Sequence, residues 1–339
     1  MKKTDADWMR RARELAKRGL GWKQPNPCVG AVIIRNGQKL GEGYHKRAGG
    51  PHAEIEAIRN AETRGCSCKG ATLYVTMEPC STHGRTPPCA EEIIRRGFAR
   101  VVVGATDPNP QHAGRAYPIL KRAGIKVAKG VLEKECERLN VAFNHWIRTR
   151  RPWVIAKAAM TLDGFLKMPK KKRLTGTEAR RDVHQLRAIC GAILVGAETV
   201  RADNPRLTVR GVKHLRQPWR IVVTRTGNLP KQARLFMDRH KERTLVFQNK
   251  SWRGILRELG KRDVTRLLVE GGGKIFESLA QAKLINEVWI YYAPFLANPS
   301  CQKNLSLPNG YALQQMRLKN AELTIVGEDL KLRGFCASL

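Results

Sequence analysis

Residues Glu78–Cys89 read EPCSTHGRTPPC, a loop that holds two cysteines and three prolines. The apolar run 71–77 comes directly before this loop and predicts a buried strand. The run 90–96 follows it, has helical periodicity and ends at Gly97. Both cysteines are therefore expected between a strand and a helix, where a helix start favours the thiolate form of a nearby thiol.

A second amphipathic helix is predicted to begin at His52, and its first turn carries Glu54. A catalytic zinc ion has three protein ligands and lowers the pKa of water to about 7. We predict that His52, Cys80 and Cys89 are these ligands and that Glu54 moves the proton. His-x-Glu followed by Pro-Cys and a second cysteine is the arrangement of zinc deaminases. The alternative, that these residues are ordinary core side chains, does not explain their order on two strand–helix units.

The composition favours a globular chain with two domains. It has 339 residues, 42% of them hydrophobic, and a formal net charge of +34. The basic residues are spread along the chain without aromatic motifs, so nucleic acid is not an expected partner, whereas a phosphorylated small substrate would benefit from the positive field. No apolar run reaches the ~18 residues of a membrane span. The start lacks the features of a secretory signal, and the nine cysteines are irregularly spaced, which together predict a cytoplasmic protein with free thiols.

The first half of the chain alternates between strand and helix patterns. A helix is expected over 8–17 and a hairpin around Asn36-Gly37. The helix that begins at His52, the strand 71–77 and the helix 90–96 follow, and then a strand is expected over 100–104. A helix ending near residue 123, a strand over 125–127 and one closing helix from Glu133 to Arg148 complete it. This alternation predicts an α/β layer fold with a largely parallel sheet after the hairpin. The boundary is expected in the charged segment that ends at Pro152, which gives domains 1–148 and 149–339.

The second half repeats the alternation without an internal sequence repeat. Strands are expected to begin at Trp153 and to cover 192–197, 220–223, 245–247 and 288–292, with a helix over 178–189. The run 266–276 predicts a strand, a glycine turn and a helix. Glycines at a helix start can bind a phosphate, although an ordinary tight turn is the simpler interpretation here. The spacing is not Gly-x-Gly-x-x-Gly, so a standard dinucleotide-binding fold is not indicated.

Together these motifs resemble the bifunctional riboflavin-biosynthesis deaminase–reductase family. Asn26-Pro27-x-Val29-Gly30, the His52 and Cys80 motifs and Asp107-Pro108-Asn109-Pro110 are similar to its deaminase half. Three further motifs are similar to its reductase half, namely Leu162-Asp163-Gly164, the run Ala202-Asp203-Asn204-Pro205-x-Leu207-Thr208-x-Arg210, and Val269-Glu270-Gly271-Gly272. The resemblance implies a cytidine-deaminase-like α/β/α domain followed by a dihydrofolate-reductase-like α/β domain.

The resemblance also implies the chemistry and its residues. A diaminopyrimidinone ribosyl phosphate would lose an amino group at zinc (Zn²⁺), and NADPH would then reduce its ribose to a ribityl chain. Residues that would hold the substrate are Asn26, Arg85, Asp107 and Asn109 in the first half and Arg187, Leu207, Arg210 and Glu270 in the second. Residues that would hold NADPH are Ala159, Thr199, Asp203, Gly272, Gly273, Lys274 and Ser278.

Two features depart from the family pattern. Thr82 stands where the family has a histidine directly after Cys-Ser, and His83 follows it. A short basic segment, 167–173, replaces a Ser/Gly-rich loop, with Arg173 in place of a tryptophan that packs near the nicotinamide. An active deaminase with a degenerate reductase half therefore competes with the two-step enzyme.

An RNA or tRNA base deaminase and a basic binding protein with decayed sites are two more competing hypotheses. The tRNA enzymes use Cys-x-x-Cys, unlike the longer spacing from Cys80 to Cys89. The intact zinc set argues against decay. A homo-oligomer is compatible with the sequence.

Overall fold

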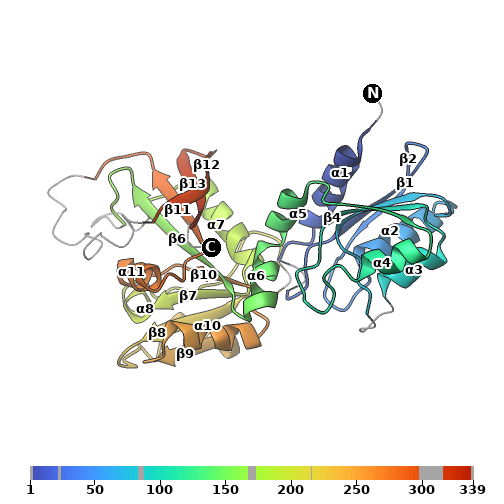
Figure 1. Ribbon diagram of the computed structural model, residues 1–339. Coiled ribbons are helices and arrows are strands. Elements are labelled where there is room, and N and C mark those ends of the chain that lie inside the picture. Colours follow the sequence, from blue (N-terminus) through green and yellow to red (C-terminus); the bar gives the residue numbers. More distant parts are fainter. Residues whose placement is uncertain are drawn as a thin grey trace. The chain divides into compact units, whose positions relative to one another are not determined.

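The computed structural model describes residues 3–21, 24–82, 88–166, 173–214, 216–297 and 316–336. The chain forms two compact units, Met1–Arg150 and Arg151–Leu339, and each is described by itself (Figure 1). In the described ranges, no helix combines the length and the apolar character needed to cross a membrane.

The first unit alternates between strands and helices as the sequence predicts. It differs from the prediction mainly near its end. A single helix was expected from Glu133 to Arg148, but the chain forms two helices that meet at Asn140. The side chain of Asn140 is buried and bonds the backbone of Cys28, which anchors this break. The elements are α1 (Asp5–Lys17), β1 (Gly30–Arg35), β2 (Gln38–Tyr44), α2 (Ala53–Glu62), β3 (Thr72–Met77), α3 (Cys89–Arg95), β4 (Arg100–Ala105), α4 (Ala116–Arg122), β5 (Lys126–Lys129), α5 (Glu133–Leu139) and α6 (Val141–Thr149).

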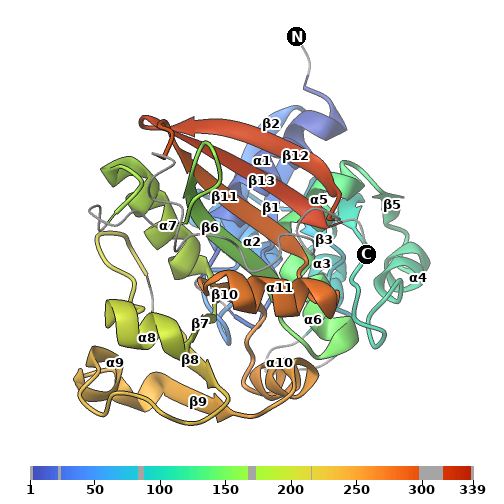
Figure 2. The same cartoon turned by 90° about the vertical axis from the view of Figure 1, so that its left-hand side faces the viewer.

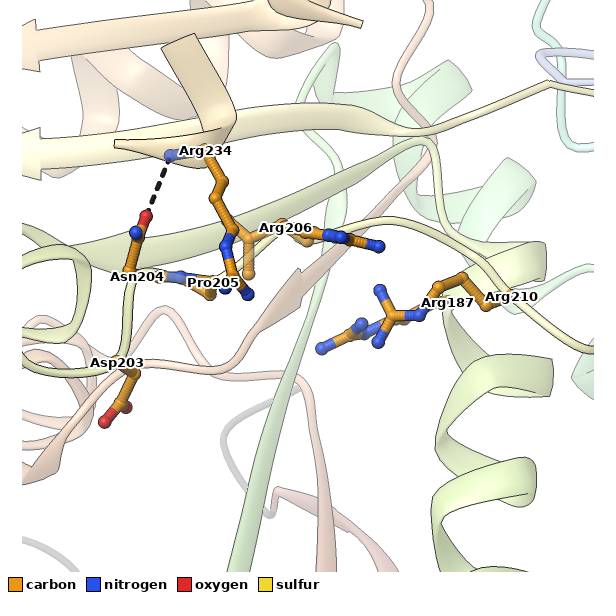
Figure 3. Close-up of a pocket in the computed structure, with 8 residues that line it drawn as sticks. Arg187, Asp203, Asn204, Pro205, Arg206, Arg210 and Arg234 are labelled. Carbon is orange, nitrogen blue, oxygen red and sulfur yellow. Dashed lines mark hydrogen bonds between the residues drawn. The ribbon is translucent and has the colours of Figure 1, made fainter. Parts of the chain in front are cut away.

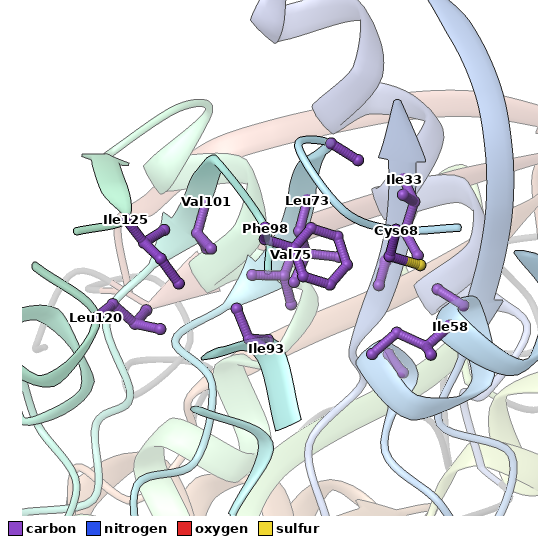
Figure 4. Close-up of a cluster of buried hydrophobic side chains, with 14 of the residues drawn as sticks. Ile33, Ile58, Cys68, Leu73, Val75, Ile93, Phe98, Val101, Leu120 and Ile125 are labelled. Atoms are coloured by element: carbon purple, nitrogen blue, oxygen red, sulfur yellow. The ribbon is translucent and has the colours of Figure 1, made fainter. Parts of the chain in front are cut away.

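The described strands of this unit form one sheet in the order β2-β1-β3-β4-β5. The hairpin pairs are antiparallel, whereas β3, β4 and β5 are parallel. Alternate strand residues point to opposite faces, so each face buries its own apolar set. Helices α2, α3 and α4 pack on one face around Leu73, Val75 and Ile93 (Figure 4). Helices α1 and α5 cover the other face, which gives an α/β/α sandwich (Figure 1).

Glycines in β2 let helix α2 lie directly on the hairpin. A Cβ atom on Gly41 would lie 2.4 Å from the carbonyl oxygen of Ala57, and one on Gly43 would lie 2.5 Å from the backbone nitrogen of the same residue. Real Cβ atoms do not approach backbone so closely, so only glycine permits this packing. The close approach holds α2 against the hairpin, and His52 is the N-cap of this helix.

The second unit is also an α/β layer. Its elements are β6 (Trp153–Thr161), α7 (Thr177–Ile189), β7 (Ala192–Gly196), α8 (Ala197–Asp203), β8 (Trp219–Thr224), α9 (Arg234–Met237), a 3-10 turn η1 (Lys241–Arg243), β9 (Thr244–Gln248), α10 (Trp252–Lys261), β10 (Arg266–Val269), α11 (Gly273–Gln281), β11 (Glu287–Ala293), β12 (Leu318–Val326) and β13 (Asp329–Cys336). The predicted strands and the helix of residues 178–189 are confirmed. Sequence reasoning missed α8, α9 and α10 and the final hairpin.

The described strands of this unit form one sheet in the order β12-β13-β11-β6-β10-β7-β8-β9. The strands from β11 to β9 are parallel, and the hairpin β12–β13 adds an antiparallel edge (Figure 2). Helices α10 and α11 pack on one face, and α7 packs on the other against Tyr291. Because parallel strands end at one edge, the residues after β7, β8 and β10 come together there, as ligand-binding residues do in such sheets.

Candidate active sites

The sheet edge of the first unit collects the predicted zinc ligands. His52 is the N-cap of α2 and Cys89 is the first residue of α3, while Cys80 follows β3. The Nδ1 atom of His52 lies 3.5 Å from the sulfur of Cys80 and 3.3 Å from that of Cys89. All three ligand atoms lie within 4.8 Å of one another. Three residues distant in sequence thus converge on one point.

The two thiols favour a cation between them. A hydrogen bond from the Cys89 thiol, aided by His52, holds the pKa of Cys80 at about 4. The pKa of Cys89 rises, because its thiol is that hydrogen-bond donor and is also buried. Two adjacent thiolates repel each other, so both ionise only beside a positive charge. Zinc prefers this set of two thiolates and one imidazole, so these residues fit the metal.

Glu54 lies in the first turn of α2 and is only 3% exposed. Burial raises its pKa to about 6. A carboxyl group that titrates near neutrality can both accept and return a proton. The side chain is close enough to Cys89 to interact with it directly, which places the carboxylate beside the ligand cluster.

His45 is a site residue that sequence reasoning did not assign. It follows β2 and is 3% exposed. Its Nδ1 lies 2.9 Å from the carbonyl oxygen of Pro51, so Nδ1 carries the proton, and its Nε2 accepts from the amide of Asn26 at 3.1 Å. Its ring meets that of His52 edge-on, with 5.3 Å between centroids. His45 therefore links the predicted substrate residue Asn26 to the ligand cluster.

A second missed residue, Glu78, holds the loop after β4. Its side chain is 4% exposed. One carboxylate oxygen accepts the backbone N–H groups of Asp107, at 3.2 Å, and Gly114, at 2.8 Å. The other accepts that of Ala116 at 3.0 Å. Because β3 and β4 are parallel, Glu78 and this loop follow neighbouring strand ends, and the carboxylate fixes the loop beside the ligands.

The loop carries two predicted substrate residues. Asp107 accepts the backbone N–H of Asn109 at 2.8 Å, and burial raises the pKa of Asp107. The nearby His112 lies 3.3 Å from the hydroxyl of Thr82, which joins this loop to the cysteine loop. Arg85, another predicted substrate residue, and His83 lie outside the described residues.

In the second unit, Arg187 and Glu270 form a buried ion pair. Arg187 lies on α7, and Glu270 directly follows β10. Two parallel hydrogen bonds of 2.7 Å join them, and their side chains are 13% and 12% exposed. Burial opposes ionisation of Glu270, but the charge and hydrogen bonds of Arg187 prevail and lower its pKa to about 2. Burial also lowers the pKa of the neighbouring Lys157.

A pocket of about 270 Å³ lies beside this pair (Figure 3). It contains three predicted substrate residues, Arg187, Leu207 and Arg210, and one predicted cofactor residue, Asp203. The fully buried Leu207 adopts a left-handed backbone conformation with φ 50°. Residues on both sides of Leu207, Arg206 before it and Arg210 after it, line the pocket. The other lining residues are Asn204, Pro205, Arg206 and Arg234.

The predicted cofactor residues are spread along the same sheet edge. Ala159 lies in β6 and packs near Tyr291, whereas Thr199 lies within α8. Gly272 is the N-cap of α11, where no side chain caps the helix, and the space around its missing Cβ is open for 4 Å.

The remaining cofactor candidates lie on α11 itself. Gly273 is its first residue, and Lys274 pairs with Glu198 of α8 at 3.1 Å. Ser278 points toward α10, since its hydroxyl accepts a hydrogen bond from Trp252 at 2.7 Å. An open, uncapped helix start suits a phosphate. The basic segment 167–172 lies outside the described residues.

Family comparisons cover both units. The family model described as "Cytidine and deoxycytidylate deaminase zinc-binding region" matches residues 2–105, and the one described as "RibD C-terminal domain" matches residues 152–332. The chain is 39% identical to the riboflavin biosynthesis protein RibD of Actinobacillus pleuropneumoniae, with 97% of this chain and 94% of the relative covered. It is 39% identical to the RibD protein of Escherichia coli, with 97% and 98% covered.

Solved structures give the same result. Acinetobacter baumannii RibD has a TM-score of 0.87 at 37% identity and covers 98% of this chain and 99% of its own. The Thermotoga maritima protein described as a "diaminohydroxyphosphoribosylaminopyrimidine deaminase/ 5-amino-6-(5-phosphoribosylamino)uracil reductase" also has a TM-score of 0.87, at 35% identity, with 98% and 99% covered. These four relatives are covered almost completely at 35–39% identity, and three of them are named RibD. The chain belongs to the RibD family of riboflavin biosynthesis proteins.

Proposed function

We propose that this chain catalyses two consecutive steps of riboflavin biosynthesis. It removes an amino group by hydrolysis from 2,5-diamino-6-ribosylamino-pyrimidinone 5'-phosphate. It then uses NADPH to reduce 5-amino-6-(5-phosphoribosylamino)uracil to the ribitylamino product. The observation that carries this proposal is the convergence of His52, Cys80 and Cys89 within 4.8 Å, beside the buried Glu54, in a chain of the RibD family.

In the deaminase unit, His52, Cys80 and Cys89 would hold zinc. A bound zinc ion supplies a Lewis acid that brings the pKa of water close to neutrality. The carboxylate of Glu54 accepts a proton from the attacking water and returns one to the departing amino group, a role that its raised pKa supports. The fixed neutral ring of His45 holds the Asn26 amide, so that this amide can donate a hydrogen bond to the pyrimidine.

The loop held by Glu78 completes the proposed pyrimidine site. Its residues Asp107 and Asn109 offer a carboxylate and an amide at the edge of the ligand cluster. Arg85 is proposed to contact the phosphate, because guanidinium groups bind phosphate in a bidentate manner. Each of these groups recognises the substrate without taking part in proton transfer.

In the reductase unit, Glu270 and Arg187 are proposed to orient the ribose, with Leu207 and Arg210 around them. NADPH supplies the hydride for the reduction. Ala159, Thr199, Asp203 and the start of α11 from Gly272 to Lys274 are proposed to hold it, and the open helix start suits its phosphates. Ser278, on the same helix, is also proposed to hold NADPH.

The test uses the purified chain of 339 residues. Metal analysis should find one zinc ion per chain, the diamino substrate should release ammonia, and the deaminated compound should drive NADPH oxidation. Deamination of tRNA without turnover of the pyrimidine would overturn the proposal. Ammonia release without NADPH oxidation would restrict the function to the first unit.

A further inference from the structure

The pocket of the second unit holds more positive charge than the proposed substrate residues account for. Arg187 and Arg210 lie together on one side, and Arg206 and Arg234 approach from the other (Figure 3). Arg187 is already neutralised by Glu270. Neither Arg206 nor Arg234 forms an ion pair within the described parts of the chain. The side chains of Arg206, Arg210 and Arg234 are exposed to solvent and line one pocket, so an anion can bind between them through charge-assisted hydrogen bonds.

The surplus matches one phosphate group. Arg206, Arg210 and Arg234 outnumber the one lining carboxylate, that of Asp203, by two charges. A phosphate monoester carries about −1.5 to −2 at pH 7. Burial lowers the pKa of Arg210, and the neighbouring charges of Arg187 and Arg206 lower it further.

The two additional arginines are fixed relative to each other by a buried third. Arg220 on β8 is 1% exposed. It donates to the carbonyl oxygen of Arg206 at 3.2 Å and to that of Leu235 at 2.7 Å, and it pairs with Asp238 at 2.7 Å. Leu235 directly follows Arg234 in α9, so the guanidinium group of Arg220 connects the backbone segments that carry Arg206 and Arg234.

Asn204 forms a second connection between the same two backbone segments. It ends α8 in a left-handed conformation with φ 42°, and its side-chain oxygen accepts the backbone N–H of Arg234 at 2.8 Å (Figure 3). The backbone on both sides of the pocket is therefore fixed without any ligand. A site that is held in place in this way loses little freedom when it binds an anion.

The helix start that is proposed to hold the NADPH phosphates lies away from this pocket. Glu198, in the first turn of α8, pairs with Lys274 at the start of α11. Asp203, the last residue of α8, lines the arginine pocket and is itself proposed to hold NADPH, so the cofactor is expected at the edge of the pocket and its phosphates at the other end of α8. A helix of seven residues spans about 10 Å, so the open start of α11 and the pocket lie at opposite ends of α8.

We propose that Arg206 and Arg234 bind the 5'-phosphate of the pyrimidine substrate in the reductase site. They would be specificity-determining residues that favour the phosphorylated compound over its dephosphorylated form. This inference rests on the function proposed above. It assigns a role to Arg206, which stands at an unspecified position of the motif from Ala202 to Arg210, and to Arg234, which lies outside the motifs.

The experiment measures the reductase kinetics of Arg206→Gln, Arg234→Gln and the double variant, each made in the 339-residue chain. Arg253→Gln, an exposed position on α10 outside the pocket, is the matched control. Each pocket variant should raise the KM for the phosphorylated pyrimidine about ten-fold or more, since hydrogen bonds to charged groups are among the strongest. The KM for NADPH, the kcat and ammonia release in the first unit should stay unchanged. Arg234→Lys should keep part of the affinity, because it keeps the charge and loses the bidentate geometry.

The dephosphorylated ribosyl compound separates recognition from structural damage. Wild type and variants should reduce it with equal, low efficiency. An unchanged KM for the phosphorylated compound, an equal rise for both compounds, or a rise in the KM for NADPH would each overturn the proposal.

Inorganic phosphate tests the pocket independently of catalysis. If the wild-type chain does not oxidise NADPH at all, the proposed reduction fails, but phosphate should still raise the Tm of wild type and of Arg253→Gln. It should not raise the Tm of the double variant. Equal stabilisation of all three proteins would overturn the pocket assignment.

Discussion

Glu78 offers a sharp test of how the first unit is organised. Its carboxylate is buried and accepts three backbone N–H groups, those of Asp107, Gly114 and Ala116. In Glu78→Gln one oxygen becomes an amide nitrogen, which cannot accept a hydrogen bond. The remaining oxygen can still accept the N–H groups of Asp107 and Gly114. The backbone N–H of Ala116 then faces the new amide nitrogen, which is also a donor.

The expected cost follows from this geometry. Losing one hydrogen bond to a charged acceptor and leaving a buried donor unpaired should destabilise the loop by about 2–4 kcal/mol. The loop carries Asp107, so deamination should lose about ten- to a hundred-fold in kcat/KM, since small displacements of positioning groups are costly. NADPH oxidation in the second unit should be unaffected, which gives a control within the same molecule.

Hydrogen exchange read by mass spectrometry measures the local effect. Peptides that cover residues 105–117 should exchange faster in Glu78→Gln than in wild type. Glu137→Gln, an exposed position on α5, should match wild type. Unchanged exchange in this segment, or an equal loss of both enzymatic activities, would refute the view that Glu78 acts by fixing the loop.

Three further predictions concern the two sites. Arg187→Met should lower the free energy of unfolding by about 3–5 kcal/mol, because it leaves Glu270 buried without its partner; a loss below about 1 kcal/mol in urea unfolding would contradict this. The pKa of His184 is lowered from 6.5 to about 4, chiefly by burial. Between these two values the unfolded chain binds a proton at His184 and the folded chain does not, so the free energy of unfolding should fall as the pH falls from about 6.5 to about 4. His184→Asn should flatten that slope in urea titrations from pH 7 to 4, and equal slopes would refute it. Cys89→Ser should lose zinc while it keeps NADPH oxidation; full metal content would exclude Cys89 as a ligand.

Local patterns predicted most of the fold, and they placed the residues that converge. The strand before Glu78 and the helices that begin near His52 and Cys89 are confirmed. His52, Cys80 and Cys89 were expected to be ligands of one metal ion, and their ligand atoms do lie together. Periodicity and spacing sufficed because these side chains sit on regular elements.

Long-range partners could not be predicted from patterns. Asn140 breaks the helix expected over 133–148 because its side chain is bonded to Cys28, more than a hundred residues away. Glu78 and His45 looked like ordinary loop residues, since their roles depend on contacts with segments that are distant in sequence. The same holds for Arg234, whose place in the pocket depends on Asn204 and Arg220.

The hairpin β12–β13 was missed for a different reason. Strand β12 is exposed along most of its length, so its sequence lacks the alternation of a half-buried strand. Its partner β13 pairs with both β11 and β12, and these long-range pairings are not visible in the local sequence pattern.

We propose that one chain performs both reactions at separate sites and that Glu54 is essential to the first alone. The test compares NADPH oxidation by wild type and by Glu54→Gln, each started from the diamino substrate and from the deaminated compound. Wild type should oxidise NADPH with either compound, and Glu54→Gln should do so only with the deaminated one. Oxidation by Glu54→Gln from the diamino substrate at the wild-type rate, or by neither protein from either compound, would contradict the account.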